Sequence, residues 1–304
     1  MPEPWKTLPI ASATPAAPAR SGQVPSGTAP VARLVYLAPP AGAPVDLVVA
    51  AARRLSALGF GLALGTEVAE RRARSPVEHQ ALVRTLGALA LPTGFVAGAG
   101  DESASGAPTL SDEIAAVVRE AQAIEEAGGV PLILPLSVLS RRRAKESEYV
   151  EAYHAVFARL GGPLFVDWTS AALRPELYDY FPGASFERVL ALEPTEVRGA
   201  RIALFDVARE AKLRRVLAAR DQLLFTADRA HLAPLLFGGN PAAPPAAFVP
   251  TQKQVELAGR SVALGDFSHA LLALPGREEA LAKALEHLSA GDLAGWQAAA
   301  AELA

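Results

Sequence analysis

The chain has 304 residues, of which 51% are apolar, and its formal net charge is −3. A chain of this length forms one large domain or two small ones and can bury a sizeable core. The charge excludes a protein that binds nucleic acid through a basic face. The lack of cysteine excludes disulfides, thiol catalysis and cysteine-bound zinc, and it fits a reducing cytoplasm, where we expect the protein to reside.

Nothing in the sequence predicts a membrane protein. No apolar run reaches the roughly 18 residues that a membrane-spanning helix needs. The first residues lack the basic-then-apolar order of a signal peptide. We therefore expect neither a membrane nor a nucleic acid among the partners.

Residues 1–30 are rich in Pro, Ala, Ser and Gly and show little periodicity, which predicts an irregular N-terminal arm. From residue 31 onward, short apolar runs alternate with longer segments of helical period. Such runs are typical of buried strands. The runs predict strands at 32–38, 59–65, 93–99, 130–136, 163–168, 199–205, 222–227 and 268–274.

The segments between the runs carry helix start and stop signals. One opens with Ser75, Pro76 and Glu78, a cap followed by a first-turn proline and an early acid. The next is expected to open at Ser111 and to close on paired glycines. The predicted helices cover 44–59, 75–89, 109–129 and 147–162.

Short buried strands that alternate with helices predict a parallel sheet covered by helices. Seven or eight such units over about 250 residues fit a closed (β/α)8 TIM barrel, and an open doubly wound sheet is the alternative. We place the barrel at residues 31–275 and a pair of C-terminal helices, broken at Gly291, at 276–304. A proline-rich segment, 238–262, interrupts the alternation before the eighth strand.

The functional site of such a barrel lies at the C-terminal ends of its strands. Polar or glycine residues at those ends are therefore the candidate site residues. The candidates for substrate binding are Thr66, Glu67, Gly100, Asp101, Ser137, Trp168, Thr226 and, at the start of the eighth strand, His269. The candidates for catalysis are Asp167, Asp228 and, inside the sixth strand, Arg201.

Side-chain alternation directs four residues of the sixth strand toward the barrel interior, namely Gly199, Arg201, Ala203 and Phe205. A charged arginine inside a barrel is costly unless it is paired. Acids at neighbouring strand ends can pair with it, namely Asp167, Asp228 and Glu67. The arginine fits either an ion pair that fills the barrel or an anchor for a substrate carboxylate or phosphate.

The other candidates have equally plain structural alternatives. Asp167 with Trp168 fits a general base beside a stacking face, and the tryptophan fits a core residue equally well. The glycine-rich segment GAGDES, which holds Gly100 and Asp101, fits an anion-binding turn or an ordinary tight turn. His269 fits an acid–base group or a structural histidine. No pair of histidines has metal spacing, so no metal or other cofactor is expected.

An ordered set of segments resembles the dihydrodipicolinate synthase and N-acetylneuraminate lyase superfamily of (β/α)8 aldolases. In particular, the chain resembles a branch of bacterial proteins that are uncharacterised and dihydrodipicolinate synthase-like. The resemblance covers roughly residues 7–290. The segments are LPIASATPAA, GFVAGAGDES, AQAIEEAGGVPLIL, PLFVDW, VRGARIALFDVAREAKLRRVL, LLFTAD and GDFSHALL.

This resemblance implies a lysine in the sixth strand that forms a Schiff base with an α-keto acid such as pyruvate. It also implies a proton-relaying tyrosine after the fourth strand and a hydroxyl-bearing turn that holds the carboxylate. Here the lysine position is Arg201, which stays protonated and cannot form an imine. The tyrosine position is Leu136 or Ser137, whereas the hydroxyl, Thr66, is retained.

Three functions are consistent with this pattern. The first is a barrel that binds a small keto acid or related carboxylate, with altered lyase, hydratase or isomerase chemistry on Arg201 and an acid at Asp167 or Asp228. The second is a non-catalytic homologue that pairs with an active paralogue. The third is a Schiff-base lyase that uses another lysine, Lys212 being the first choice. We favour the first, as a homo-oligomer in which lysine-imine chemistry is lost.

Overall fold

The computed structural model describes residues 31–100, 109–238 and 253–303, so the predicted N-terminal arm lies outside the described residues. Eight parallel strands close into a barrel in the order β1-β10-β7-β6-β5-β4-β3-β2. This order confirms the (β/α)8 barrel over the open sheet. The barrel strands are β1 (Val35–Leu37), β2 (Gly61–Leu64), β3 (Phe95–Ala99), β4 (Val130–Ile133), β5 (Leu164–Thr169), β6 (Val197–Ala203), β7 (Leu223–Thr226) and β10 (His269–Leu272).

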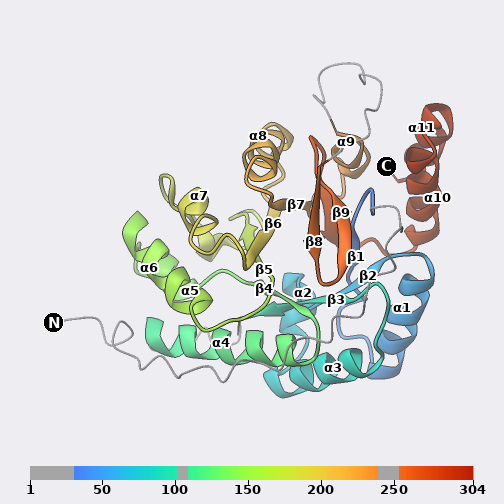
Figure 1. Cartoon of the computed structure of the whole chain (residues 1–304). Helices are drawn as coiled ribbons and strands as arrows, with labels where there is room; N and C mark the ends of the chain where they lie inside the picture. Colours follow the sequence, from blue (N-terminus) through green and yellow to red (C-terminus); the bar gives the residue numbers. More distant parts are fainter. Residues whose placement is uncertain (1–30, 101–108, 239–252, 304) are drawn as a thin grey trace.

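Helices surround the strands (Figure 1). The four predicted helices correspond to α1, α3, α4 and α6, and shorter helices of five or six residues were not predicted because they are too short to show a period. The helices are α1 (Val45–Ala57), α2 (Val68–Arg72), α3 (Pro76–Ala88), α4 (Leu110–Glu126), α5 (Ser137–Arg141), α6 (Glu146–Phe157), the 3-10 helix η3 (Pro175–Leu177), α7 (Ser185–Val189), α8 (Val207–Ala218), α9 (Leu232–Phe237), α10 (Glu278–Ser289) and α11 (Leu293–Ala301).

Two helix starts test the capping signals. Ser75 caps α3 as expected, and with Glu78 it forms a capping box, because the Ser75 hydroxyl accepts from Glu78 N–H and the Glu78 carboxylate accepts from Ser75 N–H. The predicted start of α4 at Ser111 is wrong. Thr109 caps that helix by accepting a hydrogen bond from Asp112 N–H, since its extended backbone leaves the hydroxyl free to turn back.

The core has two layers that follow from strand alternation. One apolar cluster fills the barrel and includes Tyr36, Phe165, Phe225 and Leu271. The other lies between the strands and the surrounding helices. In β6 the alternation holds for Arg201 but not for Phe205, which lies beyond the strand with φ +56° and is half-exposed. The prediction that Phe205 faces the interior is therefore wrong, because the strand ends at Ala203.

The proline-rich insert contributes a hairpin. Strands β8 (Gln254–Leu257) and β9 (Arg260–Ala263) pair antiparallel, and residues 239–252 lie outside the described part of the chain. Val255 and Leu257 of the hairpin belong to the same apolar cluster as the barrel interior. Val31 N–H, just before β1, donates to Ser261 O at 2.9 Å. The hairpin therefore closes the barrel at the N-terminal ends of its strands.

Helix α10 belongs to the ring of helices around the barrel. It follows β10, and its Glu278 forms an ion pair with Arg54 of α1 at 2.9 Å, so the last and first helices of the ring are neighbours. Leu281 and Leu288 of α10 are buried in the outer core layer. Of the two predicted C-terminal helices, α11 alone follows the completed barrel. No helix in the described ranges is long and apolar enough to cross a membrane.

Candidate functional site

Arg201 lies in the middle of β6 with only 2% of its surface exposed. Its backbone is opposite Asp167 of β5 in the register of the two strands. Two residues earlier, a Cβ atom on Gly199 would lie 2.0 Å from Leu223 O of β7. Glycine is required there because the two backbones are in close contact. The sequence GAR thus combines tight strand packing with an inward arginine.

The arginine joins three strands and the segment after β2. Its Nη1 donates to Asp167 Oδ1 at 2.8 Å, Nη2 donates to Glu67 Oε1 at 2.7 Å, and Nε donates to Leu271 O of β10 at 3.0 Å. Thr169 donates to the other oxygen of Asp167 at 2.6 Å. We call Glu67, Asp167, Thr169 and Arg201 the Arg201 cluster. It confirms two of the three acids that the sequence offered as partners.

Electrostatics keep the Arg201 cluster charged. Burial alone lowers the pKa of Arg201, but the charges of Glu67 and Asp167 outweigh burial and raise that pKa above its ordinary value. The three ionised groups sum to −1. The hydrogen bonds above use three of the five guanidinium N–H groups, and the other two have no partner among the described residues.

Thr66, directly before Glu67, is buried, and its hydroxyl has no hydrogen-bond partner among the described residues. It follows Gly65, whose φ of +64° turns the chain at the end of β2. Gly65 N–H donates to Glu70 at 2.8 Å, and burial raises the pKa of that carboxyl to about 7. A buried hydroxyl without a partner is rare, because its desolvation is not compensated. The Thr66 hydroxyl is therefore a candidate contact for a polar ligand atom.

Asp228 lies apart from the Arg201 cluster in its contacts. Its carboxylate accepts from His231 at Nδ1 (2.8 Å) and from His231 N–H (3.2 Å). Thr226 faces the helix layer and donates to Glu210 of α8, which also accepts from Ser268 at 2.6 Å. Burial raises the pKa of Glu210 to about 7. Because the Asp228 carboxylate binds His231 in its own loop, the expected alternative that Asp228 pairs with Arg201 is wrong.

Two aromatic candidates lie away from the cluster. Trp168 points into the outer layer, where its ring packs on Phe181 and Phe186 at centroid distances of 5.5 and 4.4 Å. The prediction of a stacking face beside Asp167 is wrong, because neighbouring residues of a strand face opposite sides. His269 is the first residue of β10 and its Nδ1 accepts from Leu34 N–H at 2.9 Å. Burial lowers its pKa to about 3.

Two of the remaining candidates, Gly100 and Ser137, donate to acids of α4. Gly100 N–H donates to Glu120 at 2.8 Å, and Asp101 lies outside the described residues. Ser137 donates to Glu113 through its backbone and its hydroxyl, at 2.7 and 2.8 Å. Glu120 and Glu113 of α4 thus accept hydrogen bonds from backbone N–H groups of the loops after β3 and β4. Gly100 and Ser137 therefore have a structural role that the sequence pattern did not show.

Several polar residues of the site region escaped sequence reasoning. Tyr180 accepts from Leu136 N–H at 2.6 Å after β4 and lies 3.0 Å from the Tyr153 hydroxyl. Burial raises the pKa of Tyr180 well above its usual range. His79 of α3 is buried, with Nε2 3.0 Å from Gly98 O, and burial lowers its pKa to about 3. Each reaches the strand ends from a distant segment, so no local spacing could reveal it.

None of the four described lysines is buried inside the barrel. Lys212 is exposed on α8, and Lys145, Lys253 and Lys283 are exposed as well. Lys6 lies outside the described part. In the ranges that the structure describes, no group of three or more histidine and acidic residues is arranged to hold a metal ion.

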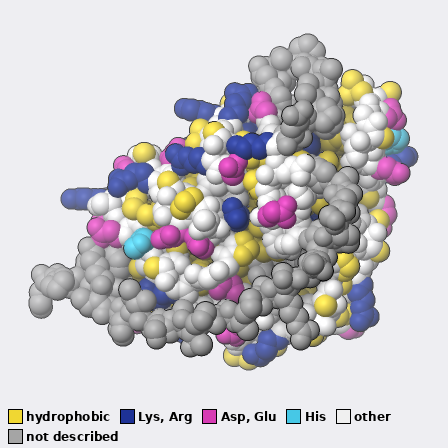
Figure 2. Space-filling view, viewed as in Figure 1, with side chains coloured by type: hydrophobic (Ala, Val, Ile, Leu, Met, Phe, Trp, Pro, Cys, Tyr) yellow, Lys and Arg dark blue, Asp and Glu magenta, His cyan; other side chains and the backbone are white. Residues whose placement is uncertain are grey.

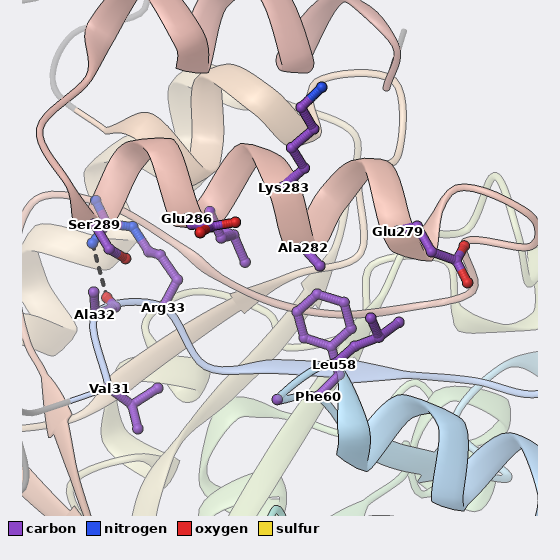
Figure 3. Close-up of a pocket in the computed structure, with 12 residues that line it drawn as sticks. Val31, Ala32, Arg33, Leu58, Phe60, Glu279, Ala282, Lys283, Glu286 and Ser289 are labelled. Carbon is purple, nitrogen blue, oxygen red and sulfur yellow. Dashed lines mark hydrogen bonds between the residues drawn. The ribbon is translucent and has the colours of Figure 1, made fainter.

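A groove of about 530 Å³ lies at the other end of the barrel, between the segments before β1 and β2 and helix α10. Figure 3 shows its wall formed by Leu58 and Phe60, with Lys283 directed away from it. Arg33 donates to Ala32 O at 2.8 Å rather than into the groove. The cationic groups of the groove, Lys283 and Arg33, therefore do not converge as polar groups do in a ligand pocket. In the view of Figure 2, acidic and basic side chains are interspersed with apolar ones.

These observations define a (β/α)8 barrel protein with a buried charged cluster inside the barrel. The chain belongs to the family described as "Protein of unknown function (DUF993)", whose family model matches residues 12–302. A comparison with curated proteins finds no match.

Solved structures of the dihydrodipicolinate synthase family have the same fold. YagE of E. coli K12, a prophage protein of that family in complex with pyruvate, has a TM-score of 0.61 and 13% identity, over 89% of this chain and 80% of its own. The Acinetobacter baumannii dihydrodipicolinate synthase complexed with pyruvate has a TM-score of 0.58 and 12% identity, over 88% and 78%. The Agrobacterium tumefaciens synthase has a TM-score of 0.57 and 16% identity, over 89% and 79%. These likenesses establish the barrel.

Proposed function

We propose that the chain binds a small 2-oxo acid or a related carboxylate in the barrel, at Thr66 and Arg201. The observation that carries the proposal is the buried hydroxyl of Thr66, which has no hydrogen-bond partner among the described residues and belongs to the residue before Glu67, the ion-pair partner of Arg201. A hydroxyl and an arginine are donors suited to a carboxylate. The complexes of two fold neighbours with pyruvate support this ligand class.

The chemistry on this ligand does not use a lysine imine. An arginine at position 201 stays charged and cannot be the nucleophile, and the four described lysines are all exposed. What Arg201 offers is a fixed positive charge and two N–H groups, without a partner in the described part of the chain, that can polarise a ligand oxygen. Asp167, held by Arg201 and Thr169, is the nearest candidate for proton transfer. Any reaction is therefore a proton transfer or elimination next to a polarised carbonyl.

The alternative is a non-catalytic subunit that pairs with an active paralogue. The observation that favours it is that Arg201 already has two carboxylates and a carbonyl as partners, as in an ion pair that fills a barrel. Self-association into a homo-oligomer is compatible with both functions and stays a prediction.

The first test measures melting temperatures with pyruvate, 2-oxobutyrate, oxaloacetate and sugar acids, since a ligand of the folded state raises the melting temperature by mass action. Thr66→Val should leave the free protein at least as stable, because an unsatisfied hydroxyl is removed, and should abolish the ligand-induced rise.

Thr93→Val is the matched control, because the Thr93 hydroxyl is also buried without a partner among the described residues, but it precedes β3 at the opposite end of the barrel. Its ligand-induced rise should equal that of the wild type. Borohydride should trap no adduct with any keto acid. A trapped adduct, or no rise with any acid in the wild type, would overturn the proposal.

A further inference from the structure

The two carboxylates on Arg201 are held very differently. Asp167 is 2% exposed at its side chain, it lies opposite Arg201 in the barrel register, and its second oxygen accepts from Thr169. The Glu67 side chain is 27% exposed, and its Oε2 has no hydrogen bond among the described residues. Asp167 is therefore a fixed partner of the arginine, whereas Glu67 is attached to the site by one hydrogen-bonded oxygen.

The position of Glu67 in the chain adds to this difference. It is the residue before α2, a helix of five residues that follows the turn at Gly65. Its side chain reaches Arg201 from that turn rather than from a barrel strand. Rotation about side-chain bonds is enough to release it toward solvent, while Asp167 cannot leave without distorting β5.

We infer that Glu67 occupies the position on Arg201 where a ligand carboxylate binds, and that an entering ligand carboxylate displaces it. This inference rests on the carboxylate site proposed above. Charge counting favours exchange over addition. With Glu67 in place, a bound anion would put three negative charges around one arginine, whereas exchange leaves two.

Displacement makes Glu67 a specificity-determining residue. Only a ligand that brings its own negative charge replaces Glu67 without leaving the buried guanidinium short of a partner. Uncharged analogues, such as an amide in place of the carboxylate, cannot make the exchange. The residue thereby selects small carboxylates and sets how tightly they bind.

The experiment is chemical complementation of Glu67→Ala. This variant leaves the outer edge of Arg201 unpaired, so its melting temperature should fall and should recover with formate or acetate more than with chloride at equal ionic strength. Acetamide should give no recovery. Pyruvate, measured by titration calorimetry, should bind the variant about tenfold or more tightly than the wild type, because no internal carboxylate competes.

Glu279→Ala is the matched control. Glu279 pairs with Arg54 at 2.8 Å, but both side chains are largely exposed, so water replaces the lost carboxylate and acetate should bring no specific recovery. Glu67→Gln, which keeps the side-chain shape and removes the charge, serves if the alanine variant does not fold. It should show the same tighter binding of pyruvate.

The outcomes separate this inference from the proposed function. If the wild type binds pyruvate through Thr66, but both Glu67 variants bind it no more tightly and gain nothing from acetate, the displacement of Glu67 is wrong and the proposed site stands. If acetate and formate rescue Glu67→Ala while 2-oxo acids bind no better than acetate and Thr66→Val changes nothing, the displacement stands and the proposed ligand class is wrong.

Discussion

The buried polar side chains at the two ends of the barrel differ in their charge and in how they are stabilised. Toward the C-terminal end, Arg201 stays charged because Asp167 and Glu67 surround it. At the N-terminal end, His269 has no acidic partner among the described residues, and burial lowers its pKa to about 3, so the ring is neutral at ordinary pH. The hairpin closes that end with apolar side chains. Arg201 thus keeps its charge beside two counter-charges, whereas His269 is buried as a neutral ring.

The largest effect is expected where that compensation is broken. Arg201→Met leaves Asp167 buried without its cation and should lower the free energy of unfolding by about 3–5 kcal/mol, measured by urea denaturation. Combining it with Asp167→Leu and Glu67→Gln removes the stranded charges and should restore most of the loss. If Arg201→Met alone were as stable as the wild type, the cluster would not require its cation.

The apolar end is tested by Leu257→Ala in the hairpin. Leu257 is 2% exposed against the barrel interior, so truncation should cost about 2–4 kcal/mol by urea denaturation through lost burial and a new cavity. Glu256→Ala, an exposed neighbour on the same strand, should change stability little. Neither variant should alter the ligand-induced rise in melting temperature. A loss of binding in Leu257→Ala would mean that the two ends are coupled.

The smallest expected effect concerns a third buried group, Glu210, whose carboxylate accepts hydrogen bonds from the hydroxyls of Thr226 and Ser268. Its pKa is raised from 4.5 to about 7, so its folded form keeps the proton longer than the unfolded chain. Stability should therefore fall as the pH rises from about 4.5 to 7. Glu210→Gln should remove up to about 3 kcal/mol of that fall.

The measurement for Glu210→Gln is urea denaturation at pH 5 and pH 8. Some dependence should remain in the variant, because the pKa of Glu70 is also raised to about 7. An unchanged difference between the two pH values would show that Glu210 is ionised in the folded protein throughout.

The sequence predicted the barrel well because its signals are local. All eight predicted strand segments overlap a barrel strand, and Ser75 caps its helix where a cap was expected. The hairpin of the insert was not predicted, because its first strand alternates buried and exposed residues instead of forming the continuous apolar run that marks the barrel strands. The start of α4 was misplaced by two residues because two hydroxyl residues compete for the cap.

By itself the sequence determined that an arginine faces the barrel interior at position 201, since side-chain alternation in a strand is a local property. It also determined which acids were within reach. Only the tertiary structure decided among them, because Glu67, Asp167 and Asp228 are far apart along the chain and the choice depends on which side chains meet Arg201 in space. The same holds for the Thr66 hydroxyl, whose burial without a partner is a property of the packed barrel.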